Sequence, residues 1–426
     1  MNKRTKTALR RWCLYGWTLA KWTMAASAIG VVCGLIGTMF HFGVHEVTAF
    51  RGTHPWVLYL LPLAGFVIVS FYKLTETDGL GTDDIIDAVH EGKRLPILLL
   101  PAIFFGTVLT HLCGGSAGRE GAALQMGGTI GQCMGRTFRL DDRDLRVATL
   151  AGMAAFFSAL FGTPLAATVF AIMVISIGVI YHVALYPSLL AALVAYGVSV
   201  RLGVEPTRFT VAVPDQSVGM FVRVAALGVL CALVSILFCK LMHGAGHLMK
   251  RIKNPWLRVI CGGFAVIALT WIFGTDYNGA GMDIVTRAIE QETVAVPWAF
   301  LLKLVFTAVT LAAGFKGGEV VPSFFVGATF GCAVSPLLGL PVGFGAAVGL
   351  AAVFCGVTNC PVASTLLAVE LFGAEGMLYF ALACCLSYML SGYQGLYSSQ
   401  TILYSKLKAQ FINVHTNAYH AGEKTE

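Results

Sequence analysis

Long apolar runs alternate with short polar segments along almost the whole chain. A helix needs about 20 apolar residues to cross a bilayer, and the pattern predicts membrane helices at 24–42, 55–72, 95–113, 163–181, 218–239, 257–273, 297–313 and 375–392. The first run is long and has no cleavage-site pattern after it. We therefore expect it to stay in the protein as the first span rather than to be removed as a signal peptide.

Composition agrees with this pattern. Of the 426 residues 57% are hydrophobic and 12% charged, and the mean hydropathy is +0.77. Soluble domains carry about 25% charged residues, so this chain has too few of them to cover its apolar surface in water. The sequence predicts an all-α polytopic membrane protein whose surroundings are the lipid bilayer.

The net charge of +7 indicates topology rather than nucleic-acid binding. Residues 1–23 form a basic segment without an acidic residue, which predicts a cytoplasmic N-terminus; its basic residues are Lys3, Arg4, Lys6, Arg10, Arg11 and Lys21. The short polar tail, 406–426, also contains lysines, and we place it in the cytoplasm too. Both termini on one side imply an even number of full spans, and no regulatory domain is expected in the tail.

The twelve cysteines are scattered, mostly inside apolar runs, and form no C-x-x-C pair. They are expected to be small buried hydrophobic residues in a reducing compartment. No metal site and no cofactor are predicted, and neither the G-x-G-x-x-G nor the Walker spacing of nucleotide-binding loops occurs. Nothing in the sequence indicates an enzyme.

The chain contains an internal duplication. Residues 152–168, GMAAFFSALFGTPLAAT, align without gaps on residues 349–365, GLAAVFCGVTNCPVAST, with seven of 17 positions identical. At an offset of 199, Gly118-Arg119-Glu120 falls on Gly317-Gly318-Glu319. Two halves with the same order of elements are typical of transporters, whose binding site lies where interrupted helices of the two halves meet.

The stretch GGSAGREGAALQMGG, residues 114–128, places a charged pair among glycines inside apolar sequence. The glycines before Ala122 predict a break, with a new helix beginning near residues 119–122. A helix N-terminus has unpaired N–H groups and about half a positive charge, so it attracts anions. Glu120 is then a carboxylate at an anion site, able to occupy the site itself, to yield it to a permeating ion and to carry a proton.

These motifs resemble the CLC family of chloride channels and anion/proton antiporters. GREG followed by a glycine-rich helix is similar to the family's gating motif, and GGEVVPSFF to its second anion motif. The resemblance spans residues 24–405 and implies two inverted repeats, 24–210 and 211–405, with helix termini inside the membrane around a central anion site, and a homodimer. By residue it implies that Glu120 is the gating glutamate, that Arg119 and Gly121 shape its helix start beside Gly118, and that Val320 and Val321 present backbone amides.

The departures from the chloride members are similar to the fluoride/proton antiporter branch. Gly79-Leu80-Gly81 stands where the first anion motif carries a serine, Met173 and Val174 replace the inner proton-accepting glutamate, and Glu319 replaces an apolar residue. Asn359 and Tyr397 also match that branch and are candidate anion contacts. The resemblance implies a plasma-membrane exporter of fluoride driven by protons, in a bacterial inner membrane. A chloride or nitrate transporter or channel of the same fold is the alternative; a non-transporting scaffold has no use for carboxylates at intramembrane helix starts.

Our hypothesis for Glu319 is that burial keeps its carboxyl group neutral part of the time. It then carries the second proton and donates a hydrogen bond to fluoride, and its alternative role is structural, as a partner of Lys316.

Each remaining candidate has a structural alternative. Tyr397 is either in the pore or an anchor at the membrane interface, Asn359 either contacts the ion or caps the helix after Pro361, and His111 is either a proton carrier or a packing residue. Glu370 is expected to be structural. Asp141, Asp142 and Asp144 are expected to form a solvated loop and helix cap.

Overall fold

The computed structural model describes residues 3–293, 296–408 and 410–417. In this part of the chain helices dominate, and a break after residue 201 separates two series of them. The first series is α1 (Lys3–Thr53), η1 (Pro55–Leu60), α2 (Leu61–Leu74), α3 (Thr82–Glu91), α4 (Leu99–Leu112), α5 (Glu120–Thr137), α6 (Asp142–Phe161), α7 (Pro164–Met173), η2 (His182–Ala184) and α8 (Leu185–Arg201). The second is α9 (Val218–Met249), α10 (Pro255–Phe273), α11 (Met282–Glu290), α12 (Ala299–Ala313), α13 (Val320–Leu338), α14 (Val342–Thr358), α15 (Pro361–Phe372) and α16 (Met377–Leu390).

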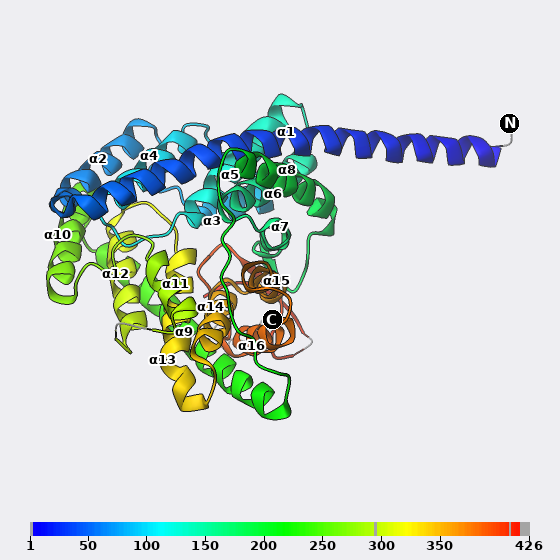
Figure 1. The fold of residues 1–426 in the computed structure, drawn as a ribbon. Coiled ribbons are helices and arrows are strands. Elements are labelled where there is room, and N and C mark those ends of the chain that lie inside the picture. The colour runs from blue at the N-terminus through cyan, green and yellow to red at the C-terminus, as the bar shows by residue number, and fades with distance from the viewer. Residues whose placement is uncertain (1–2, 294–295, 409, 418–426) are drawn as a thin grey trace.

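The two series repeat the same packing. α5 packs on α6 as α13 packs on α14, and α1 packs on α8 as α9 packs on α16. The pairs α2–α4 and α6–α7 likewise correspond to α10–α12 and α14–α15. Figure 1 shows the first half mainly in blue to green and the second mainly in green to red. The duplication predicted from the two aligned segments therefore extends to the whole helical unit.

The halves meet where two glycine-rich segments cross. Gly118 and Gly318 form an antiparallel bridge, with N–H···O distances of 2.7 and 2.8 Å in the two directions. Two further hydrogen bonds are reciprocal: the Ser116 amide donates to Thr310 Oγ1 at 3.1 Å, and the Lys316 amide to Thr110 Oγ1 at 3.2 Å. A residue paired antiparallel with its own counterpart is what a two-fold axis between the halves produces. The repeat is thus inverted, as the family resemblance implied.

This crossing corrects one detail of the sequence alignment. The reciprocal bonds relate the halves by an offset of 200, not 199, so Glu120 corresponds to Val320 and Glu319 to Arg119. Glu120 is the first residue of α5, whereas Glu319 is the N-cap residue of α13. The two glutamates are therefore one position out of equivalence. Successive side chains at a helix start point in different directions, so the two carboxylates can face opposite sides of the crossing.

The predicted spans are confirmed in most places. Seven helices in the described part are long and apolar enough to cross a membrane, and six shorter apolar helices accompany them. The run 163–181 is wrong as a single span, because α7 ends at Met173 and the short strand β1 (Ser176–Ile177) follows. Helices α6, α8, α13 and α14 were missed as spans; in α6 and α13 the small and polar residues lower the mean hydropathy below that of α9.

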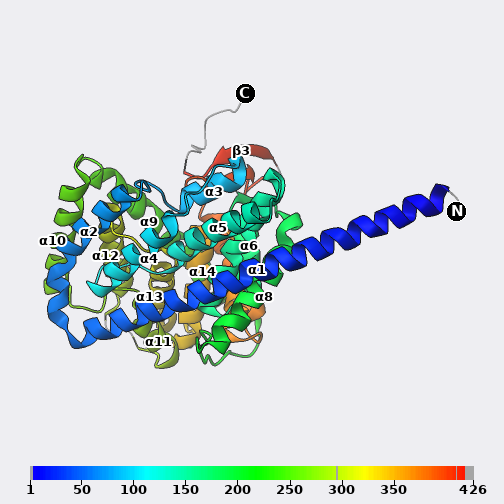
Figure 2. The same cartoon turned by 90° about the horizontal axis from the view of Figure 1, so that it is seen from above.

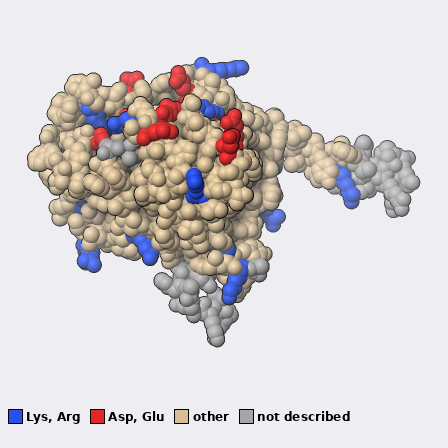
Figure 3. All heavy atoms as spheres, turned by 60° about the horizontal axis from the view of Figure 1, so that its bottom comes forward, with Lys and Arg blue, Asp and Glu red and all other residues tan. Residues whose placement is uncertain are grey.

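The distribution of charged and apolar side chains on the surface is consistent with a lipid bilayer as its surroundings. In Figure 3 the acidic side chains gather in the upper part of the view and a broad area below them carries few charges; exposed large apolar residues include Phe264, Trp271 and Leu337. The helix α1 begins at Lys3, so the basic N-terminal segment continues directly into the first span. Figure 2 shows its N-terminal half projecting beyond the body of the molecule.

Helix α5 packs against α6 through glycines that recur every fourth residue along one face. A Cβ atom added at Gly131 would collide with the Ala148 carbonyl oxygen, and one at Gly127 with the Gly152 carbonyl oxygen. The second half repeats this contact, with Gly327 and Gly331 against Gly349 and Gly345. Small residues let helix backbones approach closely in a membrane.

We expect Gly131→Ala to destabilise the protein by about 1–3 kcal/mol, the usual cost of overpacking a core, because backbone atoms cannot yield to the methyl group. Gly244→Ala is the matched control: it also lies in a helix, but a Cβ there meets nothing within 4 Å. Thermal unfolding in detergent measures both. A melting temperature of Gly131→Ala equal to that of the control would contradict the packing account.

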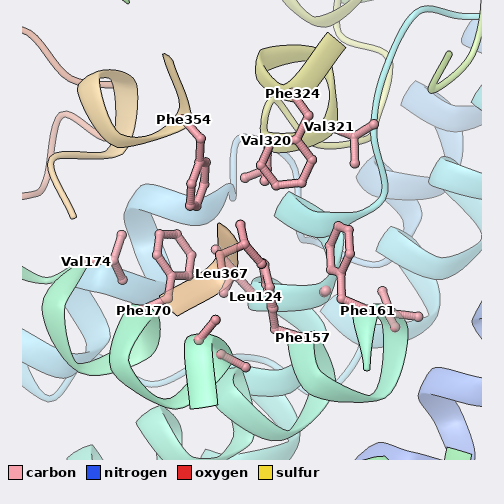
Figure 4. Close-up of a cluster of buried hydrophobic side chains, with 14 of the residues drawn as sticks. Leu124, Phe157, Phe161, Phe170, Val174, Val320, Val321, Phe324, Phe354 and Leu367 are labelled. Atoms are coloured by element: carbon pink, nitrogen blue, oxygen red, sulfur yellow. The ribbon is translucent and has the colours of Figure 1, made fainter. Parts of the chain in front are cut away.

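Apolar side chains fill the centre of the molecule beside the start of α13. Five phenylalanines form a closed ring of neighbours, with centroid separations of 4.9 to 5.9 Å; they are Phe157, Phe161, Phe324, Phe354 and Phe170. Figure 4 shows this cluster with Val320 and Val321 at its edge. Polar contacts for an ion near this cluster must therefore come from helix ends rather than from the cluster's own side chains.

A three-stranded sheet in the order β1–β2–β3 stands beside the helices. β2 (Thr401–Tyr404) pairs in parallel with β1, and β3 (Phe411–His415) pairs antiparallel with β2. The described part of the predicted polar tail is therefore folded. Lys406 is half-buried, with its ammonium group over the Tyr388 ring at 4.6 Å and donating to the Tyr388 carbonyl at 3.1 Å, and desolvation lowers its pKa to about 7.

Candidate functional site

Glu120 begins helix α5, as the sequence predicted, and is fully buried. Its Oε2 accepts the backbone N–H of Arg119 at 2.9 Å, and Arg119 Nε lies 3.7 Å from Oε1. Oε1 has no hydrogen-bond partner among the described residues. The carboxylate therefore occupies the positive end of its own helix, where an anion is stabilised by N–H groups and the helix dipole.

The second half of the chain also contributes to the surroundings of the Glu120 carboxylate. A Cβ added at Gly118 would collide with Glu120 Oε2 and lie 3.1 Å from both Val321 Cβ and Pro322 Cδ. Val320 and Val321 are buried in the first turn of α13. The N-termini of α5 and α13 thus converge on one carboxylate, and any side chain at Gly118 would displace it.

A cavity of about 490 Å³ opens next to this carboxylate. We call it the Glu120 cavity; besides Glu120 its lining includes His41, His45, Arg51, His111, Arg119 and Val321. Arg51 Nη1 donates to the His111 carbonyl at 2.7 Å, and Arg119 Nη1 to His41 Nδ1 at 3.0 Å. Arginines from two elements place positive charge in the cavity that the carboxylate lines, and sequence reasoning had not identified Arg51.

Glu319 faces a different cavity of about 270 Å³, the Glu319 cavity. Its lining includes Gly79, Leu80, Gly81, Asp83, Lys316, Glu319 and Tyr397. Glu319 is half-buried at the N-cap position of α13, and its Oε2 lies 3.4 Å from a Cβ atom built at Gly121. The carboxylate of one half therefore reaches the residue next to Glu120, while opening toward the other cavity.

The suggested pairing of Glu319 with Lys316 is not found. Among the described residues Lys316 forms no ion pair, and its ammonium group lies 4.1 Å from the centre of the Tyr72 ring. Lys316 nevertheless lines the Glu319 cavity. It supplies positive charge there without neutralising Glu319.

The segment Gly79-Leu80-Gly81 reaches the Glu319 cavity as predicted, but two of its amides are already engaged. The Leu80 amide donates to the Thr77 carbonyl at 3.2 Å, and the Gly81 amide to Asp84 Oδ2 at 3.0 Å. Asp83, the next acidic residue, accepts the Ser399 amide at 3.0 Å, and burial raises the pKa of its carboxyl group. The role of the segment in anion binding stays a prediction.

Tyr397 is buried with 3% exposure and lines the Glu319 cavity. Its hydroxyl has no hydrogen-bond partner within the described residues. An interfacial anchor would be exposed to the lipid headgroups, so that alternative is wrong. A free phenol O–H is a donor available to an anion in this cavity.

Asn359 lines neither of the two cavities. It ends α14 in the left-handed region, with φ of 61°, and its Nδ2 donates to the Gln394 carbonyl at 3.0 Å and to Gln400 Oε1 at 3.1 Å. Its Oδ1 accepts from Lys406. The residue before α15 is Cys360, without a side-chain cap, so Asn359 does not cap α15. Direct ion contact stays a prediction, although the amide is committed to holding the C-terminal segment.

The remaining acidic candidates are structural, as expected. Glu370 of α15 accepts the amides of Leu165 and Ala166 at 3.1 and 2.8 Å, which satisfies the N-terminus of α7. Asp141 is the N-cap of α6 and accepts the Asp144 amide at 2.8 Å, and Asp144 pairs with Lys21. These carboxylates therefore hold helices rather than ions.

The described residues contain no cluster of three or more histidines, cysteines, aspartates or glutamates able to hold a metal ion. The polar residues that line the two cavities include carboxylates, arginines, a lysine, histidines and two tyrosines. Groups of these kinds are able to bind small anions and to carry protons.

Three comparisons bear on this arrangement. The family model described as voltage gated chloride channel matches residues 62–392. A "Chloride/fluoride channel protein" of Pseudomonas syringae pv. tomato is 38% identical over 400 residues, covering 91% of this chain and 88% of the relative. The H(+)/Cl(-) exchange transporter ClcA of Vibrio vulnificus is 25% identical over 407 residues, covering 87% of this chain and 86% of that protein.

Solved structures agree with the sequence matches. The crystal structure of a CLC-type fluoride/proton antiporter superposes with a TM-score of 0.88 at 32% identity, covering 91% of this chain and 99% of that one. A slow cyanobacterial Cl-/H+ antiporter, at 20% identity and a TM-score of 0.75, covering 87% and 94% of the two chains, shares the fold. With an inverted repeat, intramembrane helix starts and a family match over most of its length, the chain belongs to the voltage-gated chloride channel (CLC) family.

Proposed function

We propose that this chain is a fluoride/proton antiporter that exports fluoride from the cytoplasm. The observation that carries the proposal is a pair of carboxylates at adjacent helix starts that open to opposite cavities, Glu120 to one and Glu319 to the other. The relative named for chloride and fluoride and the fluoride/proton antiporter of the same fold support it. A transporter role, rather than an enzymatic one, follows from the same observation.

Orientation follows from the charge of the N-terminus. If the basic start of α1 lies in the cytoplasm, the α1–η1 turn lies on the far side, and with it the Glu120 cavity, which Gly52 and Pro55 line. The C-terminal segment and Tyr397 then lie with the Glu319 cavity on the cytoplasmic side. Both termini are thus cytoplasmic, and the bacterial relatives favour the inner membrane.

The mechanism rests on competition for the helix-terminus site. The Glu120 carboxylate holds the site by accepting the Arg119 amide; when it is protonated it loses its charge and its hold, and an anion takes its place. Glu319 receives or releases the inner proton, and its protonated form donates a hydrogen bond. Fluoride, small and with a strong demand for hydrogen bonds, gains more from such a donor than a larger halide does.

In the membrane we propose a homodimer, as the resemblance to the family implies. Its partners are the lipid bilayer, a small inorganic anion and protons, with no nucleic acid and no cofactor. Light scattering of the detergent-solubilised protein measures its mass, and a monomer at transport-competent concentrations would contradict the dimer.

Anion selectivity is the direct test of the proposed substrate. Proteoliposomes loaded with fluoride or chloride are diluted into anion-free buffer, and an ion-selective electrode follows the efflux. We expect fluoride efflux to exceed chloride efflux by about tenfold or more, which corresponds to about 1.4 kcal/mol of preference in the transition state. Equal rates of fluoride and chloride efflux would favour the alternative, a chloride transporter or channel. The name of the Pseudomonas relative includes chloride as well as fluoride.

A further inference from the structure

The Glu120 cavity contains a second buried group without a partner. His111, in the last turn of α4, is 1% exposed, and its Nε2 atom has no hydrogen-bond partner among the described residues. Its Nδ1 lies 2.9 Å from the Thr107 carbonyl oxygen. A carbonyl only accepts, so Nδ1 carries the hydrogen and Nε2 of the neutral ring is left with a free lone pair.

The same cavity contains the other unpartnered acceptor, Glu120 Oε1. Two buried acceptors without donors are unusual, because buried polar atoms normally find a partner. A cavity of about 490 Å³ whose lining includes several charged side chains has ample room for water beside both residues. A proton shared between the two atoms, directly or through water, would give each of them a hydrogen-bond partner.

His111 is held firmly at this position. Arg51 donates to its backbone carbonyl at 2.7 Å, and Thr107 fixes the ring through Nδ1. Arg51 also lies against Gly279, whose carbonyl accepts from Lys303 at 2.6 Å. The imidazole is therefore kept in one tautomer and one orientation, which suits a carrier more than a mobile surface histidine.

The charges facing the imidazole come from several elements. The groups that line the cavity or lie against it are Arg51 of α1, Arg119 before α5, Lys303 of α12, Asp276 before α11, and Asp283 and Arg287 of α11. Among these groups the positive charges of Arg51, Arg119 and Lys303 repel an imidazolium ion at His111. A proton accepted by His111 is therefore passed on soon rather than retained.

We propose that His111 carries protons between Glu120 and the water of the Glu120 cavity. The step builds on the proposed antiport and assigns the carrier on the side facing away from Glu319. The protonated Glu120 carboxyl breaks its O–H bond, directly or through one water, and a new N–H bond forms at Nε2. Nδ1 keeps its hydrogen, which it donates to the Thr107 carbonyl. The imidazolium then releases the proton from Nε2 to cavity water. The next proton acceptors along this cavity are half-buried His41 and exposed His45, whose rings stack with their centroids 6.4 Å apart.

The test uses full-length protein in proteoliposomes, with fluoride and proton fluxes recorded together. His111→Asn places an amide donor where Nδ1 stands, keeping the Thr107 contact, and removes Nε2. We expect coupled proton flux to fall about tenfold or more, within the range that a proton-transfer group contributes, and the dependence on the pH of the Glu120 side to flatten. His182→Gln, which replaces an exposed histidine outside this cavity, is the control and should behave as wild type.

Rescue separates proton transfer from packing. In His111→Ala, added imidazole should restore part of the proton flux by entering the vacated space; His111→Gln is a further variant if Asn or Ala fails to assemble. A wild-type pH profile in His111→Asn, or a loss in His111→Ala that imidazole does not reverse, overturns the proposal. Wild-type protein is measured first: if it shows no coupled flux the antiport itself fails, whereas intact coupling in both wild type and variants refutes the role of His111 alone.

Discussion

Glu120→Gln is expected to abolish proton-coupled exchange, reducing the proton flux about 100-fold. Glutamine keeps the shape of the side chain and an oxygen able to accept the Arg119 amide, which Glu120 Oε2 accepts at 2.9 Å. It cannot carry a charge or a titrating proton at the junction of α5 and α13. Anion movement is then either uncoupled from protons or blocked, depending on whether the neutral amide leaves the helix-terminus site.

Simultaneous recording of fluoride and proton fluxes in proteoliposomes measures this effect. Glu46→Gln is the matched control, because Glu46 is an exposed residue of α1 outside the Glu120 cavity. Wild-type coupling and wild-type pH dependence in Glu120→Gln would remove Glu120 from the mechanism.

Glu319→Gln is expected to have the second-largest effect, because this carboxylate is the proton-carrying candidate of the opposite cavity. The usual inner carrier is replaced by Met173 and Val174, which have no titratable group. Without a titratable Glu319, the Glu319 cavity loses the carboxylate that lies next to Glu120, and coupling should fail by about 100-fold. Selectivity should weaken as well, since the amide is a poorer donor to fluoride than a carboxylic acid.

The same two-ion flux assay measures Glu319→Gln, with size-exclusion chromatography to establish that folding and assembly survive. Glu370→Gln is the matched control: Glu370 is a carboxylate at a helix terminus that lines neither cavity. Coupled exchange at the wild-type rate in Glu319→Gln would assign Glu319 a structural role. A loss of equal size in Glu370→Gln would attribute the effect to damage of the fold instead.

The sequence predicted the architecture because the two strongest physical signals lie in local patterns. Apolar runs mark helices that face lipid, and glycines at four-residue spacing mark the close α5–α6 contact, in which Gly131 meets Ala148. The carboxylate at a helix start was predictable for the same reason. Glu120 follows glycines that end one helix and precedes residues that begin the next.

The features that could not be predicted from the sequence depend on tertiary contacts. The shift of one residue between Glu120 and Glu319 becomes visible only through the Gly118–Gly318 bridge, because glycine-rich segments align equally well at either offset. Asn359 looked like an ion contact by its motif, but its amide holds Gln394 and Gln400, which lie at least 35 residues further along the chain. Arg51 had no local signal at all, since it is one basic residue at the end of a long helix.

The central claim is that anion and proton movement are obligatorily coupled through these two carboxylates. The most direct measurement sets a fluoride gradient across proteoliposomes of the wild-type protein, with no initial pH difference and the membrane potential clamped to zero by potassium and valinomycin. The account predicts that fluoride leaving the vesicles drives protons inward, acidifying the lumen until a protonophore collapses the gradient. Fluoride efflux without proton movement would contradict the account and make the protein a channel.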